Sequence, residues 1–155
     1  MKFNHLIEIN DPLNPLSEPL TRNQLWNGLV LRAEAPQLFM PHLDSCTIMT
    51  RSGDALLREL AFGELVIRDR VLLSPQTQIE YQVPPQENIA ASTLQMSIEE
   101  PQPGVLFVRF AYDGGAAQDA ESMDAFYNEF RRSAYHEADI DTIRIIREMA
   151  EEGKL

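Results

Sequence analysis

The sequence has few cysteines, few basic residues and no long apolar run. Cys46 is the only cysteine among 155 residues, so no disulfide can form within the chain. Lys and Arg together number 13 against 24 Asp and Glu, which gives a net charge of −11. Nucleic acids and anionic membrane surfaces attract basic patches, so this charge argues against both as partners. No segment approaches the roughly 20 apolar residues of a membrane-spanning helix, so membrane insertion is not expected.

The short motifs that mark many catalytic and cofactor sites are also missing. There is no phosphate-binding glycine loop, no serine nucleophile elbow and no zinc signature. His42 and Asp44 are close in sequence, but no third metal ligand accompanies them. Cys46 fits a small strand residue better than a nucleophile, because no activating partner is near it in sequence. The sequence therefore predicts no metal and no cofactor.

The length and the N-terminal residues set the expected organisation. A chain of 155 residues fits one domain, residues 1–155, with enough core to enclose a modest pocket. Residues 1–10 contain an acid and alternate in polarity, unlike a secretory signal peptide. With a single cysteine, this predicts a cytoplasmic protein.

Seven segments have the pattern of β-strands. In the first, residues 1–10, Phe3, His5 and Ile7 alternate with polar residues, which puts His5 on the buried side. Gly, Pro and Ser separate the others at short intervals, which favours consecutive antiparallel strands. The other six expected strands span residues 45–51, 55–62, 65–73, 77–83, 92–98 and 105–112.

Two short helices are expected between the first and second strands. Thr21 and Gln24 have the spacing of a capping box, and the helix that they begin should stop before Pro36. Trp26 on this helix fits a core residue better than a ligand platform. The connector that holds Phe39 is long enough for one helical turn, and its apolar side chains either gate a pocket mouth or simply pack.

A polar row is expected inside the sheet. A hairpin that turns at residues 63–64 sets Arg58 opposite Asp69. The next hairpin, with residues 74–76 as its loop, sets Tyr81 opposite Asp69 as well. Two interpretations remain open for this row. Either the ion pair fixes the strand register, or the row binds a ligand and supplies an acid or a base.

The longest expected element is a helix over residues 119–152. Asp119 is a plausible N-cap, and Gly153 follows the end. Ile140, Ile143 and His136 should point away from the sheet, and the two isoleucines leave a homodimer contact open. At about 100° per residue, one face should hold Met123, Tyr127, Phe130, Ala134, Ala138, Ile145 and Met149. Its middle is small or polar and includes Asp141, which suggests that the helix covers a cavity, because a solid core keeps large side chains.

This order of elements resembles the helix-grip, or START-like, fold of birch-pollen-type allergens, steroid-transfer domains and polyketide cyclases. Within that superfamily the chain resembles the AtaL-like family. The resemblance covers FNHLIEINDPLNP (3–15), LTRNQLWNGLVLRAE (20–34), RELAFGELVIRDRV (58–71) and SAYHEADIDTIRIIRE (133–148). It implies an α+β fold in which a curved seven-stranded antiparallel sheet wraps around a long C-terminal helix. It also implies a cavity for a small apolar or amphipathic molecule.

Three functions stay open at this point. The first is ligand binding without chemistry. The second is a cyclase, dehydratase or isomerase that uses Asp69 or Asp141 as base, with Arg58 or Tyr81 at the developing oxyanion. The third is a protein-interaction module that resembles co-chaperone relatives of the fold. The candidate cavity residues are His5, Trp26, Phe39, Arg58, Phe62, Ile67, Asp69, Tyr81, Met96, Phe110, Tyr127, Phe130, Ala134, Ala138 and Asp141.

Overall fold

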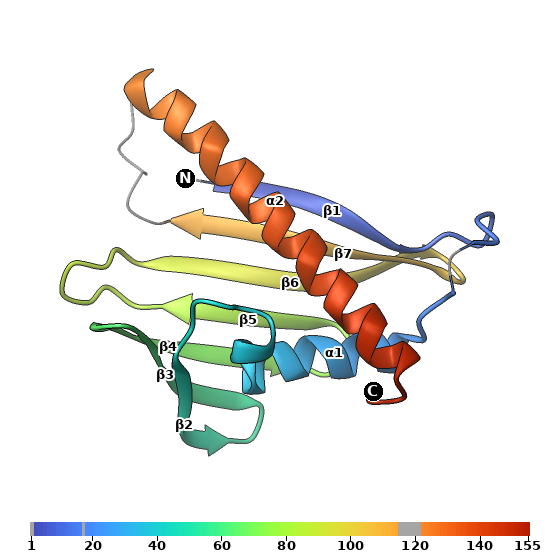
Figure 1. Ribbon diagram of the computed structural model, residues 1–155, viewed down its shortest axis with the longest axis horizontal. Helices are drawn as coiled ribbons and strands as arrows, with labels where there is room; N and C mark the ends of the chain where they lie inside the picture. The colour runs from blue at the N-terminus through green and yellow to red at the C-terminus, as the bar shows by residue number, and fades with distance from the viewer. Residues whose placement is uncertain (1, 17, 115–121) are drawn as a thin grey trace.

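A computed structural model describes residues 2–16, 18–114 and 122–155, with the side chains of the last helix described from residue 128 onward. One antiparallel sheet has the strand order β1-β7-β6-β5-β4-β3-β2. Short turns connect β2 through β7 in sequence, and β1 pairs with β7 at the far edge (Figure 1). The strands are β1 (Lys2–Asn10), β2 (Ser45–Ser52), β3 (Ala55–Phe62), β4 (Leu65–Ser74), β5 (Gln78–Val83), β6 (Ser92–Gln102) and β7 (Val105–Gly114). The predicted α+β helix-grip fold is confirmed.

Three helical elements complete the fold. Helix α1 (Arg22–Glu34) and the single 3-10 turn η1 (Pro36–Leu38) lie between β1 and β2, as predicted. The expected capping box is present, because the Thr21 hydroxyl accepts a bond from the Gln24 backbone and the Gln24 side chain accepts one from the Thr21 backbone. Helix α2 (Ser122–Glu151) crosses the sheet diagonally (Figure 1). Among the described residues, no helix is long and apolar enough to span a membrane.

Of the two hairpin registers that the sequence predicts, one is confirmed and the other is wrong. Arg58 lies opposite Asp69 in the β3–β4 pair, as predicted. In the β4–β5 pair, however, Tyr81 lies opposite Val71 and not opposite Asp69. The turn is centred on Pro75 and Gln76, closed by a 3.0 Å bond from the Thr77 backbone N–H to the Ser74 carbonyl. Because the loop sits one residue later than predicted, the pairing shifts by two residues, and each side chain keeps its face.

Helix α2 is rotated from the predicted orientation. Phe130 is 66% exposed, and Ile143, expected to point outward, is only 4% exposed. Two apolar stripes run along this helix, and contact with α1 selects the one that contains Ile146. A Cβ built on Gly28 of α1 would lie 2.6 Å from Ile146 Cγ2, so the missing side chain admits the isoleucine. Ile140 is 45% exposed, and a homodimer contact there stays a prediction.

The two ends of α2 have different outcomes. Asp119, the expected N-cap, lies outside the described residues. At the other end Gly153 has φ of 75°, a left-handed conformation that glycine adopts without strain. The Lys154 backbone N–H donates to the Met149 carbonyl at 2.9 Å, and the Gly153 N–H donates to the Ala150 carbonyl at 3.0 Å. This Schellman-type ending confirms Gly153 as the stop signal.

The core lies where α1 and the C-terminal half of α2 meet the sheet. Leu25 and Leu29 of α1 are fully buried, as is Ile146 of α2. Beneath them, the side chains of Met96 and Phe110 face each other across β6 and β7 and are also fully buried. This end of the molecule is therefore solid.

Candidate ligand-binding cavity

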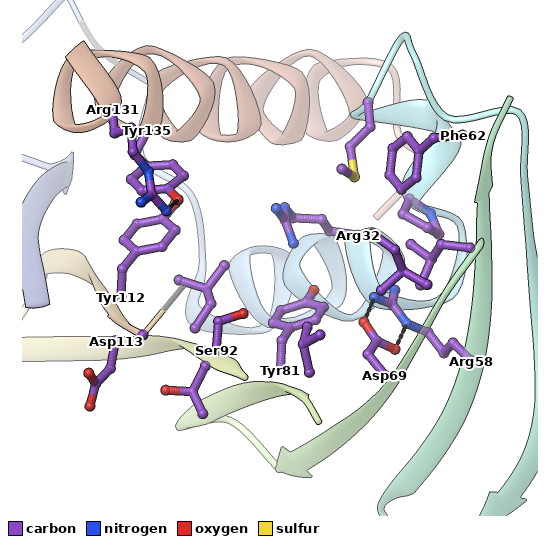
Figure 2. A pocket seen from close by; sticks show the side chains of 18 residues that line it. Arg32, Arg58, Phe62, Asp69, Tyr81, Ser92, Tyr112, Asp113, Arg131 and Tyr135 are labelled. Atoms are coloured by element: carbon purple, nitrogen blue, oxygen red, sulfur yellow. Dashed lines mark hydrogen bonds and ion pairs between the residues drawn. The ribbon is translucent and has the colours of Figure 1, made fainter. Parts of the chain in front are cut away.

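A cavity of about 260 Å³ lies beside the core, under the N-terminal half of α2. The sheet forms its floor, and the end of α1 and the segment around η1 form one wall (Figure 2). Its lining residues are Arg32, Pro36, Met40, Arg58, Leu60, Phe62, Ile67, Asp69, Tyr81, Val83, Ser92, Thr93, Leu94, Tyr112, Asp113, Gly114, Arg131 and Tyr135. Most of the lining surface is apolar, and several of the polar side chains bind one another. Such a lining is typical of sites for small amphipathic molecules.

Arg58 and Asp69 form a buried ion pair in the cavity wall. The Arg58 guanidinium donates from Nε to Asp69 Oδ1 at 2.8 Å and from Nη2 to Oδ2 at 2.5 Å. Its Nη1 donates to the Ala33 carbonyl in α1 at 2.7 Å. Burial alone would lower the pKa of Arg58, but the hydrogen bonds and charge of Asp69 outweigh it and the pKa is raised. The two charges neutralise each other and also fix the end of α1 to the sheet.

Tyr81 lies between two arginines. The Cζ atoms of Arg32 and Arg58 are each 5.1 Å from the centre of its ring, within the range of cation–π contacts. The side chain is 6% exposed. Its hydroxyl has no hydrogen-bond partner among the described residues. A buried hydroxyl without a partner is unfavourable, so this oxygen is ready to bind a ligand atom.

Arg32 is the second arginine of the cavity, and it differs from Arg58. It comes from the last turn of α1 and reaches into the space between α2 and Tyr81 (Figure 2). Its Nε is buried without a hydrogen-bond partner in the described part of the chain. No ion pair to Arg32 is formed there either, whereas Arg58 has Asp69. Asp69 therefore neutralises the Arg58 guanidinium, whereas Arg32 has no such partner among the described residues.

A polar cluster joins α2 to the edge of the sheet behind Tyr112. The Tyr112 hydroxyl lies 2.8 Å from both carboxylate oxygens of Asp139 and donates to them. His5 Nε2 lies 2.7 Å from Asp139 Oδ2, and His5 Nδ1 lies 3.2 Å from Nδ1 of His136. A neutral His5 with its proton on Nε2 satisfies both contacts. The sequence predicts a solvated His136 on the outer face of the helix. The residue is exposed, but its ring also contacts the ring of His5.

Burial dominates the electrostatics of this cluster. It raises the pKa of Asp139, against the opposing hydrogen bonds from His5 and Tyr112. It also raises the pKa of Tyr112, with a further rise from the charge of Asp139. Tyr112 therefore stays protonated and acts as a donor. Burial likewise raises the pKa of the Cys46 thiol, so this cysteine is not an activated nucleophile.

The structure divides the residues predicted to line the cavity into four groups. Those on its wall are Arg58, Phe62, Ile67, Asp69 and Tyr81. Those in the core are Trp26, Phe39, Met96 and Phe110. Those on the exposed side of α2 are Phe130, Ala134, Ala138 and Asp141. His5 lies behind Tyr112, and the side chain of Tyr127 lies outside the described residues.

The corrections on α2 share one cause, the rotation of the helix. Asp141 is exposed and pairs with Arg144 at 3.5 Å, so it cannot act inside the cavity. The buried carboxylate of the helix is Asp139, which is 1% exposed. Tyr135, Asp139 and Ile146 lie on one stripe, and this spacing could have identified the buried face. Residue spacing could not have identified Arg32 as a cavity residue, because its position depends on where α1 meets the sheet.

A curved antiparallel sheet closed over a cavity by a long C-terminal helix defines a START-type, or helix-grip, protein. The sequence matches the family of acetylaranotin biosynthesis cluster protein L, AtaL, over residues 7–153. The chain therefore belongs to the AtaL family. No curated protein sequence matches the chain.

Solved structures of aromatase/cyclases share the fold. The di-domain aromatase/cyclase StfQ from the steffimycin biosynthetic pathway has a TM-score of 0.68 at 12% identity, over 97% of this chain and 51% of that chain. The aromatase/cyclase ZhuI from Streptomyces sp. R1128 has a TM-score of 0.63 at 13% identity, over 97% of this chain and 93% of the ZhuI chain. This chain thus spans about half of StfQ.

A START superfamily protein from Mycobacterium smegmatis is also similar. Its TM-score is 0.67 at 12% identity, over 96% of this chain and 98% of that chain. At these identities the likeness concerns the fold alone.

Proposed function

We propose that this protein binds a small amphipathic molecule in the cavity between the sheet and α2. The observation that carries the proposal is the cavity itself, whose surface is mostly apolar and whose Arg32 guanidinium has no ion-pair partner among the described residues. Its volume of about 260 Å³ is close to the lower end of ligand sites, roughly 300 Å³, and suits a molecule of one or two rings. Burial of apolar ligand surface would supply the affinity, and the polar groups would fix the orientation.

A filling variant and a matched control test this proposal. Leu94 lies on the cavity wall, whereas Ala138 is exposed on α2. Native mass spectrometry of the purified protein should show a co-purifying small molecule in the wild type and in Ala138→Trp, and not in Leu94→Trp. Equal retention by Leu94→Trp would place the bound molecule elsewhere and contradict the proposal.

A second candidate function is proton transfer at a carbon next to a carbonyl, as in a cyclase, dehydratase or isomerase. The observation that favours it is the chain of contacts from Tyr112 on the cavity wall through Asp139 and His5 to His136 at the surface. Such a chain can carry a proton between the cavity and solvent. Asp139 is the buried carboxylate of α2, and it would act on a ligand through Tyr112. The likeness to aromatase/cyclases lends support at the level of the fold.

Hydrogen–deuterium exchange can separate binding from chemistry. The probe is 2-tetralone, whose protons next to the carbonyl exchange slowly in D₂O. Catalysis predicts faster exchange with the wild type than with buffer alone, and loss of the acceleration in Asp139→Asn. Binding of the ketone with exchange at the buffer rate would remove the enzymatic function for this class of substrate.

A further inference from the structure

We infer that the cavity selects molecules that carry a negative charge, and that Arg32 and the Tyr81 hydroxyl hold the charged group. The inference rests on the proposed function and adds the chemical class of the ligand. The supporting observation is the set of arginines and carboxylates on the cavity wall.

The wall contains three arginines, and their partners differ. Arg58 is neutralised by Asp69, through two hydrogen bonds of 2.8 and 2.5 Å. Arg131 donates to the Tyr135 hydroxyl at 2.9 Å and lies over its ring, with Cζ 5.7 Å from the centre. Arg32 has no ion pair or hydrogen bond in the part of the chain that the structure describes. Arg32 and Arg131 therefore both lack a counterion among the described residues, and Arg32 also lacks a hydrogen bond there.

The nearby carboxylates do not fill that role. The side chain of Asp113 is 57% exposed and lies 4.0 Å from Lys2, toward solvent. Asp139 is close enough for Arg32 to lower its pKa, but burial outweighs this effect and the pKa is raised. Its oxygens already accept hydrogen bonds from Tyr112 and lie 2.7 Å from His5 Nε2. No other carboxylate pairs with Arg32 in the described part of the chain, so a ligand anion can compensate its charge.

The partial burial of Arg32 favours this compensation. A charge removed from water loses hydration, and an opposite charge with a hydrogen bond restores the loss. The Arg32 Nε is already shielded from solvent, so a ligand anion would gain a charge-assisted bond without displacing a protein partner. A neutral ligand of the same shape would leave the guanidinium uncompensated.

Tyr81 strengthens the same subsite. Its ring lies between the guanidinium groups of Arg32 and Arg58, and its hydroxyl is buried without a partner in the described residues. The hydroxyl can donate to a ligand anion without giving up an acceptor among the described residues. Two donors without acceptors therefore lie on one wall of a mostly apolar cavity. Planar carboxylates and enolates fit this arrangement.

Arg58 holds the subsite in place and is a positioning residue. Its Nη1 donates to the carbonyl of Ala33, the residue that follows Arg32 in α1. The ion pair in the sheet thus fixes the helix end from which Arg32 projects.

The test uses two probes that differ in charge and little in shape, 2-naphthoate and 2-naphthamide, titrated by calorimetry at neutral pH. The wild type should bind 2-naphthoate on the order of tenfold more tightly than 2-naphthamide, as expected for a hydrogen bond to a charged group. Arg32→Met should abolish that preference while its affinity for 2-naphthamide changes little. Arg32→Lys should restore part of the preference, and Tyr81→Phe should reduce it.

Arg144→Met is the matched control, because Arg144 lies on the exposed side of α2 and pairs with Asp141 and Glu148. It should keep the full preference. Equal affinity of the wild type for both probes, or a preference that survives in Arg32→Met, would overturn the inference and leave the proposed function standing. Failure of both probes to bind the wild type, with no co-purifying molecule, would overturn the proposed function and the inference together.

Discussion

The two halves of α2 cover different interiors. The C-terminal half packs on α1, where Ile146 fills the space that Gly28 leaves open. The N-terminal half covers the cavity, which Arg32 and Tyr81 line (Figure 2). One helix thus covers a solid core at one end and a cavity at the other. The solid end is expected to supply stability, and the hollow end ligand binding.

The Arg58–Asp69 pair tests the limits of that division and gives the largest expected effect. It lies in the hollow end, but it joins the sheet to α1. Asp69→Ala should lower the free energy of unfolding by about 3–5 kcal/mol, because Arg58 would stay buried without its partner. Urea denaturation of the two proteins measures the difference. A loss below 1 kcal/mol would show that the wall is not fixed by this pair.

Ile146→Ala removes a buried side chain from the core at the solid end. The residue is fully buried against Gly28, so its loss should lower the free energy of unfolding by about 2–5 kcal/mol. Affinity for 2-naphthoate should stay within about threefold of the wild type, a change below 1 kcal/mol. Denaturant titration and calorimetry on the same samples check both expectations. A large loss of affinity in the folded protein would show that the two ends are coupled.

Asp139→Asn tests the polar cluster in which α2 contacts His5 and Tyr112 of the sheet. Burial raises the pKa of Asp139 in the folded protein, so the folded state holds this proton more tightly than the unfolded state. The resulting stabilisation is fully present below the unfolded pKa, about 3.9, and is lost as the pH rises through the folded pKa. The stability of the wild type relative to Asp139→Asn should therefore fall as the pH is raised from 4. Thermal or urea unfolding at a series of pH values measures this; a relative stability that rises with pH would contradict it.

Asp141→Ala should have the smallest effect. Its side chain is 61% exposed, and its 3.5 Å contact with Arg144 is a surface ion pair. Stability should change by less than about 0.5 kcal/mol, and affinity for either naphthalene probe should be unchanged. A clear loss of binding would mean that α2 can rotate toward the orientation expected from its other stripe.

That rotation marks the limit of what the sequence could predict. The Arg58–Asp69 register followed from a two-residue turn and alternating side chains, which are local features. The rotation of α2 about its axis depends on tertiary contacts, namely Ile146 against Gly28 of α1 and Asp139 against His5 and Tyr112. The predicted β4–β5 register is wrong by two residues, because the turn lies at Pro75 and Gln76, one residue later than predicted.

The site itself was only partly predictable. Arg58, Asp69 and Tyr81 could be placed on one wall from strand parity. Arg32 and Asp139 could not, because each lies on a helix whose position over the sheet is fixed by tertiary packing. A residue on a helix enters a sheet cavity only through that packing, and no pattern within the helix specifies it.

The central claim is that α2 covers a binding cavity at one end and a solid core at the other. Titration of isotope-labelled protein with 2-naphthoate, followed by two-dimensional NMR, tests it most directly. Shifts should concentrate at Arg32, Tyr81 and Leu94, while the amides of Gly28 and Ile146 stay unchanged. Shifts centred on Gly28 and Ile146, or spread over the outer face of the sheet, would contradict the account.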